Sequence, residues 1–310
     1  MITMKCRVCR DRAVIQVRRH NANFCAPHFV DHIHRQVEKT IHHYRMFTPD
    51  DRLVLGVSGG KDSLALWDIL TELGYRVDGV YLHLGIGEYS SDSLRFTQDF
   101  AEARDLELKI VDLPTDVGFS VPQAAAATAR TACSACGLSK RYLLNQVAGQ
   151  GDYDVLVMGH NLDDEATTLF GNVLQWNPEY LARQAPVLPA DEGGLKRKVK
   201  PLIRVAERET AAYAVIRGIE YEVEECPMAA GNTINRYKEW LNALEEQSPG
   251  TKANFLFGFL DRGQQAFVEH RGSVELATCA ECGQPTTGEV CAFCRLRHQT
   301  LVKIGSRAAS

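Results

Sequence analysis

One short segment limits the folds open to this chain more than any other. Residues 53–63 read Leu-Val-Leu-Gly-Val-Ser-Gly-Gly-Lys-Asp-Ser, and an apolar run at helical spacing continues to residue 73. The first five residues are typical of a buried strand, so the glycines mark a turn from a strand into a helix. A helix N-terminus offers unpaired N–H groups and the positive end of the helix dipole, which favour a phosphate chain. The segment therefore predicts an α/β fold with a phosphate-binding loop.

The glycine turn has a specific pattern. Its spacing fits neither G-x-x-x-x-G-K-[ST] nor G-x-G-x-x-G. It resembles the S-G-G-x-D-S signature of PP-loop enzymes, which split ATP into AMP and pyrophosphate. A plain strand-turn-helix corner without a ligand is the alternative interpretation. The residues that we expect to surround the phosphates are Ser58, Gly59, Gly60, Asp62 and Ser63.

The charge of the chain is small overall but uneven. The 310 residues carry a net charge of −4, which argues against a general polyanion-binding protein. Residues 1–52, however, contain ten Lys/Arg against five Asp/Glu, and residues 295–310 contain no acid. We expect both ends to contact nucleic acid, and two solvated basic ends are the alternative. The sequence shows no signal peptide and no apolar run of about 20 residues, so we expect a cytoplasmic protein without a membrane span.

Eight of the metal-binding side chains form two compact sets near the ends of the chain. The first set is Cys6, Cys9, Cys25 and His28, and the second is Cys279, Cys282, Cys291 and Cys294. Paired knuckles of this spacing can close a tetrahedral zinc site, and few apolar residues lie between them to form a core instead. Disulfides are the alternative, which a reducing compartment disfavours. The sequence predicts two zinc ions.

Three further cysteines, Cys133, Cys136 and Cys226, have no fourth partner of the same kind. Iron–sulfur clusters usually take four cysteines, so three thiolates suggest a cluster with one open iron position. A redox pair at Cys133 and Cys136, or buried inert thiols, would give the same spacing. Spacing alone leaves these alternatives open.

The order of strands and helices predicts a doubly wound parallel sheet of five strands with right-handed crossovers. The expected strands are 52–57, 77–84, 107–112, 154–158 and 221–223, with a loop or hairpin at 183–200 and a helix that starts just after Cys136. Ligands of such sheets bind at the carboxyl ends of the strands, where Ser58, Leu84, Gly159 and Cys226 fall. We expect a zinc finger at 1–30, a linking helix at 31–50, a catalytic domain at 51–230, a helical segment at 231–275, and a zinc ribbon with a basic tail at 276–310.

Seven groups of residues together carry a family resemblance that runs almost the whole length of the chain. Besides both zinc sets and the loop at 58–63, they are Leu-Gly-Ile-Gly-Glu-Tyr-Ser at 84–90, Cys-Ser-Ala-Cys-Gly-Leu-Ser-Lys-Arg-Tyr at 133–142, Gly-His-Asn-Leu-Asp-Asp-Glu-Ala at 159–166 and Glu-Cys-Pro at 225–227. The chain resembles the PP-loop tRNA thiolation enzymes, and within them the TtuA type of tRNA 2-thiouridine synthetase. The fold implied is the HUP-like PP-loop ATPase fold.

The resemblance implies an ATP-dependent replacement of a uridine 2-oxygen by sulfur in tRNA, with uridine 54 of the T-loop as the target. It implies a [4Fe–4S] cluster on Cys133, Cys136 and Cys226, and a ubiquitin-like sulfur-carrier protein with a C-terminal thiocarboxylate as donor. A homodimer is expected as well. The alternatives are a wobble-uridine or cytidine-32 thiolase of the same family, and a non-catalytic zinc-ribbon protein that binds RNA.

Individual roles follow from chemistry and from the resemblance together. Gly56, Leu84 and Gly159 are expected to line the adenosine pocket, and Asp62 to orient the loop or to hold Mg²⁺. Lys140 lies one helical turn past Cys136, so its ammonium group can reach the α-phosphate. Asp164 is expected to bind Mg²⁺ or to assist proton transfer, and the alternative for it is an acid that favours a helix N-terminus. Cys133 and Cys226 are expected either to hold the cluster or to act as a persulfide carrier and its resolving thiol.

Overall fold

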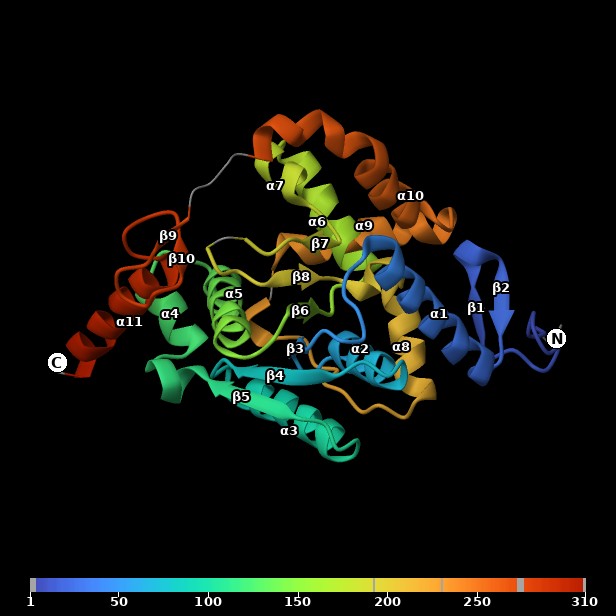
Figure 1. Cartoon of the computed structure of the whole chain (residues 1–310), viewed down its shortest axis with the longest axis horizontal. Helices are drawn as coiled ribbons and strands as arrows, with labels where there is room; N and C mark the ends of the chain where they lie inside the picture. Colours follow the sequence, from blue (N-terminus) through green and yellow to red (C-terminus); the bar gives the residue numbers. More distant parts are fainter. Residues whose placement is uncertain (1–3, 192, 230, 272–275, 309–310) are drawn as a thin grey trace.

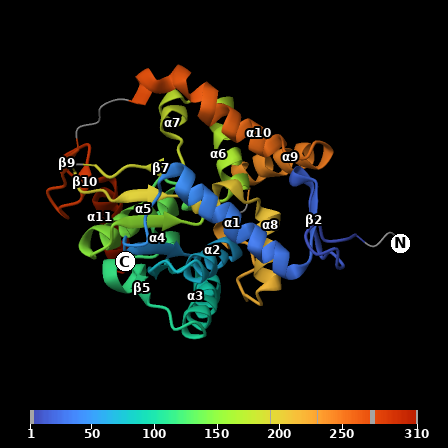
Figure 2. The same ribbon diagram turned by 45° about the vertical axis from the view of Figure 1, so that its right-hand side comes forward.

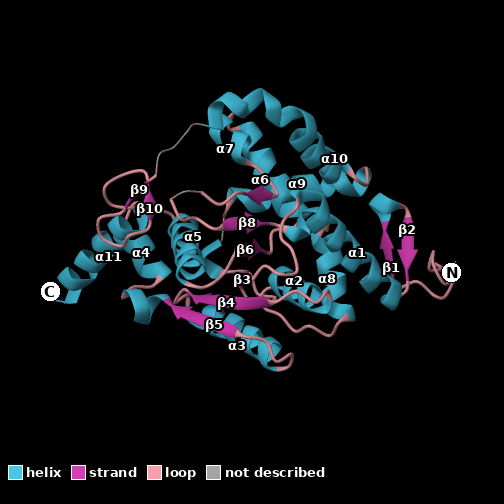
Figure 3. Ribbon diagram, in the orientation of Figure 1, coloured by secondary structure: helices cyan, strands magenta, loops and turns pink. Residues whose placement is uncertain are grey.

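A mostly parallel sheet of six strands forms the centre of the part of the chain that the structure describes. The structure, a computed structural model, covers residues 4–191, 193–229, 231–271 and 276–308. The strands are β3 (Leu53–Val57), β4 (Val77–His83), β5 (Leu108–Asp112), β6 (Val155–Met158), β7 (Val187–Leu188) and β8 (Arg197–Val199). Their order is β5-β4-β3-β6-β8-β7, and β7 is antiparallel to β8. Helices flank this sheet (Figure 1, Figure 3).

Two hydrophobic clusters fill the two faces of the sheet. Leu53, Leu55 and Val57 of β3 belong to one cluster and Val54 to the other, as expected from the alternation of side chains along a strand. The helices of the first face are α1 (Ala26–Tyr44), α2 (Lys61–Glu72), α3 (Gly87–Glu102) and α8 (Glu207–Ile216). The second face is covered by α4 (Val121–Ala127) and α5 (Ala132–Gln150).

A third hydrophobic cluster joins helices that lie beyond the β8 side of the sheet. These helices are α6 (Leu162–Leu174), α7 (Pro178–Arg183), α9 (Thr233–Gln247) and α10 (Thr251–Gly258), followed by the short turns Phe259–Gly263 and Gln264–Arg271. Phe170 of α6 packs edge-to-face against Tyr237 of α9, with ring centroids 5.5 Å apart. This contact lies in the second half of α6, and a salt bridge of 3.2 Å from Lys238 of α9 to Asp164 holds α9 at the start of α6, which follows β6 directly. The predicted helical segment thus forms one wall of the region around the strand ends.

A small module packs at each end of the described chain (Figure 1, Figure 2). The N-terminal module has the hairpin β1 (Ile15–Val17) and β2 (Ala22–Phe24), and Arg19 beyond β1 makes a buried salt bridge of 2.6 Å to Glu209 of α8. The C-terminal module has β9 (Ala277–Thr278), β10 (Pro285–Thr286) and α11 (Ala292–Ala308). Its Phe293 stacks on Tyr142 of α5 at 3.8 Å. Residues 1–3, 192, 230, 272–275 and 309–310 of the predicted segments lie outside the described residues.

Two sequence predictions about this sheet and its helices are wrong. Residues 221–223 are not a strand: Val223 is 75% exposed, and the segment touches the phosphate loop through one bond from Glu222 N to Gly59 O. The fifth parallel strand is instead β8, and β7 adds a sixth strand. Helix α5 begins before the first cysteine of its motif, because the Thr131 side chain accepts a bond from Ser134 N and caps the helix there. None of the described helices is both long and apolar enough to span a membrane.

Candidate active site

The phosphate loop lies between β3 and α2 at the carboxyl end of the sheet. Gly59 has a φ of +75°, and a Cβ atom there would lie 2.4 Å from the carbonyl oxygen of Ser93. Only glycine fits this position without strain. Ser63 Oγ accepts a bond of 3.1 Å from Ser58 N and donates one of 3.0 Å to Gly60 O, which ties the loop together. No side chain caps α2, so its first N–H groups face the loop without a side-chain acceptor.

A pocket of about 280 Å³ opens beside this loop. The predicted residues that line it are Gly56, Ser58, Gly60, Asp62, Ser63, Leu84, Lys140, Gly159 and Asp164. Gly59 does not line the pocket and packs behind it against Ser93. Gly159 allows a close approach, because a Cβ atom there would lie 3.2 Å from Ser63 Cα. The sequence therefore named nine of the twenty residues that line this pocket.

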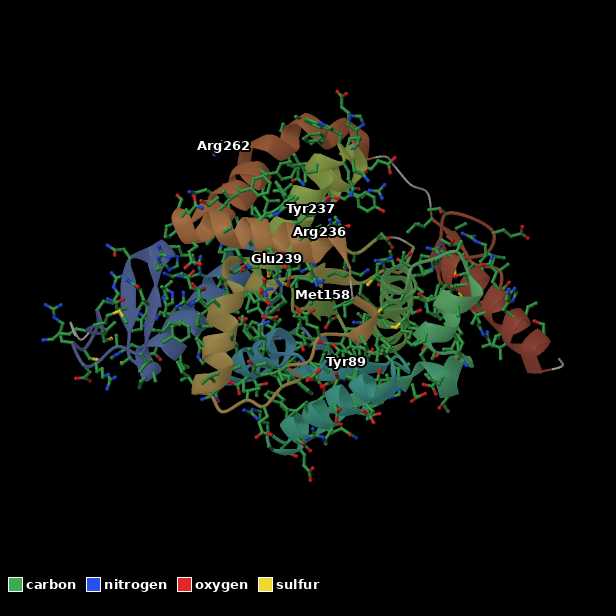
Figure 4. The ribbon with its side chains drawn as sticks, turned by 180° about the vertical axis from the view of Figure 1, so that it is seen from behind. Tyr89, Met158, Arg236, Tyr237, Glu239 and Arg262 are labelled. Atoms are coloured by element: carbon green, nitrogen blue, oxygen red, sulfur yellow. The ribbon has the colours of Figure 1, made fainter. Side chains whose placement is uncertain are left out.

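One part of the pocket is apolar and can take a flat ring. Val80, Leu82, Leu144 and Met158 line it together with Leu84. Figure 4 shows Met158 between Tyr89 on one side and α9, with Arg236, Tyr237 and Glu239, on the other. An apolar slot next to a phosphate-binding loop is the arrangement that a nucleotide requires. The predicted adenosine residues Gly56, Leu84 and Gly159 line this pocket, and their contact with adenosine stays a prediction.

The two predicted carboxylates share one buried asparagine. Asn161 Nδ2 donates to Asp62 at 3.1 Å, and Asn161 forms a reciprocal capping box with Asp164 at the start of α6. Thr210 also donates to Asp62. Burial raises the pKa of Asp62, while Lys61 and these hydrogen bonds act against that rise. Asp62 and Asp164 are therefore held in fixed positions on the same side of the pocket.

Three charged residues that the sequence analysis missed extend this arrangement. Lys61 of the loop contacts Asp62 at 3.2 Å and Glu207 at 2.8 Å, and Lys238 contacts Glu207 at 2.8 Å and Asp164 at 3.2 Å. Burial lowers the pKa of Lys238, but Asp164 and Glu207 outweigh it, so the net pKa is raised. The same pairing lowers the pKa of Glu207 against the effect of burial. Lys61 stands inside the loop motif and could have been noticed. Glu207 begins α8 and Lys238 lies within α9, and neither belongs to a motif.

Lys140 differs from these lysines because no carboxylate of the described residues pairs with it. It lines the pocket from α5, and none of the described residues forms an ion pair or hydrogen bond with its ammonium group. An ammonium group without a partner beside a phosphate loop is available for an anion. This geometry agrees with the predicted contact to a phosphate.

The three remaining cysteines converge from two segments beside the pocket. Cys133 and Cys136 lie on α5, and Cys133 Sγ is 3.7 Å from the carbonyl oxygen of Met228, two residues after Cys226. Burial raises the pKa of Cys136, to which the nearby Cys226 and Cys133 add. All three are free thiols. Their three sulfur atoms do not all lie within 4.8 Å of one another, unlike the ligand atoms of the two outer sets. A wider separation suits an iron–sulfur cluster, which binds each thiolate through a different iron atom.

The two outer sets have the geometry of single-metal sites. In Cys6, Cys9, Cys25 and His28 the ligand atoms all lie within 4.8 Å of one another, and the same holds for Cys279, Cys282, Cys291 and Cys294. Both sets lack disulfides. Four sulfur and nitrogen donors gathered in this way suit a tetrahedral structural zinc ion. The structure thus brings together both sets that the sequence spacing predicted.

Comparison with known proteins places this arrangement in a family. The PP-loop domain family matches residues 30–238, and the N-terminal LIM domain of 2-thiouridine synthetase TtuA matches residues 5–30. The tRNA-5-methyluridine(54) 2-sulfurtransferase of Thermus thermophilus is 49% identical, over 94% of this chain and 91% of that protein. This chain belongs to the PP-loop family of 2-thiouridine synthetases. The Pyrococcus horikoshii protein of the same name is 41% identical, over 94% of this chain and 93% of its own.

A solved structure of a more distant synthetase of this family shares the fold. The U34-tRNA thiolase NcsA from Methanococcus maripaludis, solved with its [4Fe–4S] cluster, superposes with a TM-score of 0.79 at 28% identity. The match covers 96% of each chain. The PP-loop fold expected from the sequence is therefore confirmed, with the six-stranded sheet as the correction. A cluster is bound in that U34-tRNA thiolase, and three free cysteines lie beside the pocket of this chain.

Proposed function

We propose that this chain is an ATP-dependent tRNA 2-sulfurtransferase that replaces O2 of uridine 54 in the T-loop by sulfur. The observation that carries the proposal is one pocket that combines a phosphate loop, an unpaired lysine and two carboxylates, with three free cysteines beside it. The names of relatives that are 49% and 41% identical support the reaction and the nucleotide. The relative whose name includes U34 is less similar, at 28% identity.

The first half-reaction would activate the oxygen. Uridine O2 attacks the α-phosphorus of ATP, and the bond from that phosphorus to the bridging oxygen of pyrophosphate breaks. Ser58, Gly60 and Ser63 would bind the pyrophosphate portion through N–H groups and hydroxyls, and Lys140 would balance the charge on the α-phosphate. Asp62 and Asp164 have the oxygen ligands that Mg²⁺ prefers. The adenylated oxygen is a much better leaving group than the original carbonyl oxygen.

The second half-reaction would replace this oxygen. A sulfur nucleophile attacks C2, the C2–O2 bond breaks, and AMP leaves with the former O2. Cys133, Cys136 and Cys226 are the residues that would hold a [4Fe–4S] cluster, which supplies an open iron position for the sulfur when bound. A persulfide on Cys133 with Cys226 as resolving thiol uses the same side chains. The donor set fits the cluster, since three thiols from two segments meet beside the pocket.

The proposal extends to partners and location. The substrate would be tRNA, and the sulfur donor a ubiquitin-like carrier with a C-terminal thiocarboxylate. The zinc modules would position tRNA, because structural zinc gives small modules a rigid shape and basic residues lie next to both. A cytoplasmic location is supported by a relative named cytoplasmic tRNA 2-thiolation protein 1 in Aspergillus niger, at 29% identity.

An assay of the complete reaction tests the proposal. Anaerobic protein, ATP, Mg²⁺, a sulfide source and tRNA should give 2-thiouridine at position 54, located by nuclease digestion and mass spectrometry. AMP should form only when tRNA is present, because adenylation requires the uridine oxygen. A transcript with uridine 54 replaced by cytidine is the control. Thiolation at position 34 would assign the other branch of the family, and absence of both AMP and 2-thiouridine would reject the proposal.

A further inference from the structure

Lys198 of β8 is a half-buried cation without a partner. Two nearby basic residues have partners: Arg197 of the same strand donates to Met46 O at 3.3 Å, and Lys200, just after the strand, forms a salt bridge of 2.8 Å with Glu165. Within the described part of the chain, Lys198 forms neither an ion pair nor a hydrogen bond. A buried ammonium group without a counter-ion is costly, so its retention calls for a ligand.

The register of the sheet shows where Lys198 points. Lys198 pairs with Leu156 of β6 in a parallel register, and paired residues of neighbouring strands face the same side. Leu156 packs with Leu143, Leu144 and Val147 of α5. The flanking Val199 belongs to the cluster on the opposite face. The Lys198 side chain therefore extends toward α5.

A second cation, Arg141, lies on α5, the helix toward which Lys198 extends. The Arg141 guanidinium lies along α5 over Gly137, where a Cβ atom would be 3.3 Å from Arg141 Nη1. Among the described residues, no carboxylate pairs with Arg141 either. Burial lowers the pKa of Lys198, and the charge of Arg141 lowers it further, whereas Asp191 acts weakly in the other direction. Arg141 is therefore near enough for its charge to act on Lys198, and no described carboxylate forms an ion pair with either cation.

This pair of cations is separate from the nucleotide pocket but close to the cysteines. Lys140 and Leu144 line the pocket, while Arg141 and Lys198 do not. Arg141 extends toward the end of α5 that carries Cys136, and the charge of Arg141 acts on that thiol. An anion between Arg141 and Lys198 would therefore lie outside the nucleotide pocket, with Arg141 near enough to Cys136 for its charge to act on that thiol.

We propose that Arg141 and Lys198 bind one backbone phosphate of the tRNA and so hold the target nucleotide beside the cysteines. The inference rests on the proposed function, which supplies the RNA. A guanidinium group offers paired donors to two phosphate oxygens, and an ammonium group adds a point charge. Contacts of this kind fix the register of a nucleic acid on the protein without reading its sequence.

Salt dependence of tRNA binding tests this assignment. The variants Lys198→Gln and Arg141→Gln, prepared as anaerobic holoprotein, are titrated with unmodified tRNA at several KCl concentrations without ATP. Each should weaken binding about fivefold to tenfold in low salt and reduce the slope of log K against log[KCl] by about 0.7–0.9, the value for one phosphate. The double variant should lose no more slope than either single variant, because both cations share one phosphate. Lys198→Arg should restore the slope.

Lys39→Gln is the matched control, since it removes one exposed charge from α1, where no described residue pairs with it. It should keep the wild-type slope. Wild-type slopes in both Lys198→Gln and Arg141→Gln would overturn the phosphate site, whatever the outcome of the thiolation assay. Loss of carrier-dependent thiolation with an unchanged tRNA slope would assign the cations to the carrier protein and overturn the RNA assignment. Failure of the wild type to thiolate tRNA would reject the proposed function alone, because the slopes are measured without catalysis.

Discussion

The ammonium group of Lys238 lies 3.2 Å from a carboxylate oxygen of Asp164, although 74 residues separate the two in sequence. The same ammonium group lies 2.8 Å from Glu207, which in turn contacts Lys61 of the phosphate loop. Helix α9 is thereby attached to two elements that form the pocket. Charges of alternating sign run from Asp62 to Asp164, so each side chain limits the positions of its neighbours.

Substitution of Lys238 by methionine should remove the ion pairs that connect Asp164 with Glu207. Asp164 and Glu207 would lose a partner while still half-buried, which costs about 1–3 kcal/mol. We expect a melting temperature several degrees lower and a reduced kcat for thiolation, because Asp164 is no longer held in place. Lys39→Met, the same change at an exposed position of α1, should alter neither. An unchanged kcat in Lys238→Met would show that Asp164 does not depend on this contact.

Replacement of Asp62 by asparagine should separate stability from activity. Burial raises the pKa of Asp62 above the ordinary 3.8, so the folded state binds its proton more tightly than the unfolded state does. The contribution of this carboxyl to stability is therefore present at low pH and lost as the pH rises through the folded pKa. At pH 7 Asp62→Asn should melt at or above the wild-type temperature, and the difference should shrink as the pH falls toward that pKa. AMP formation should be lost, and a lower melting temperature at pH 7 would contradict the sign of this shift.

Two glycines with similar backbone angles should respond differently to alanine. Gly59 has a φ of +75° and Gly74 a φ of +84°, so both substitutions incur backbone strain of about 1–2 kcal/mol. Only at Gly59 does the added methyl group meet a backbone atom, Ser93 O, while nothing lies within 4 Å at Gly74. Gly59→Ala should therefore abolish ATP binding measured by calorimetry, and Gly74→Ala should retain it. Equal ATP affinities in the two variants would show that the loop can move away from α3.

The sequence predicted those parts of the site whose residues are close to one another along the chain. The loop at 58–63 and the two zinc sets depend on residues that are close along the chain, so their spacing reports their geometry. Lys238 and Glu207 could not be found in this way, because they reach the pocket only after α9 has packed against α6. The segment 183–200 was predicted as a loop or hairpin, and β7 and β8 pair antiparallel within it, but the parallel pairing of β8 with β6 was missed for a related reason. The basic residues of β8 concealed a sheet strand, although Arg197 donates a hydrogen bond to a main-chain oxygen and Val199 is fully buried.

The C-terminal metal set should be independent of the iron. Cys279→Ser removes one of four ligands, and structural zinc contributes directly to the folding free energy of such a module. Anaerobic metal analysis should give two zinc ions per wild-type chain and fewer in the variant. The iron absorbance should stay, because Cys133, Cys136 and Cys226 belong to a different set of ligands. Loss of iron with retention of both zinc ions would mean that the cysteines are assigned to the wrong sites.

Substitution of Cys136 distinguishes the two routes of sulfur transfer. A cluster needs all three thiolates, so Cys136→Ala should lose the brown colour of the anaerobic protein and thiolation together. A persulfide route needs only Cys133 and Cys226, so Cys136→Ala would keep substantial activity there while Cys133→Ala would not. Exposure to air provides a second comparison, since the cluster route predicts parallel loss of colour and activity. Full activity in iron-free protein would exclude the cluster, and AMP formation would still follow from the separate residues of the phosphate loop.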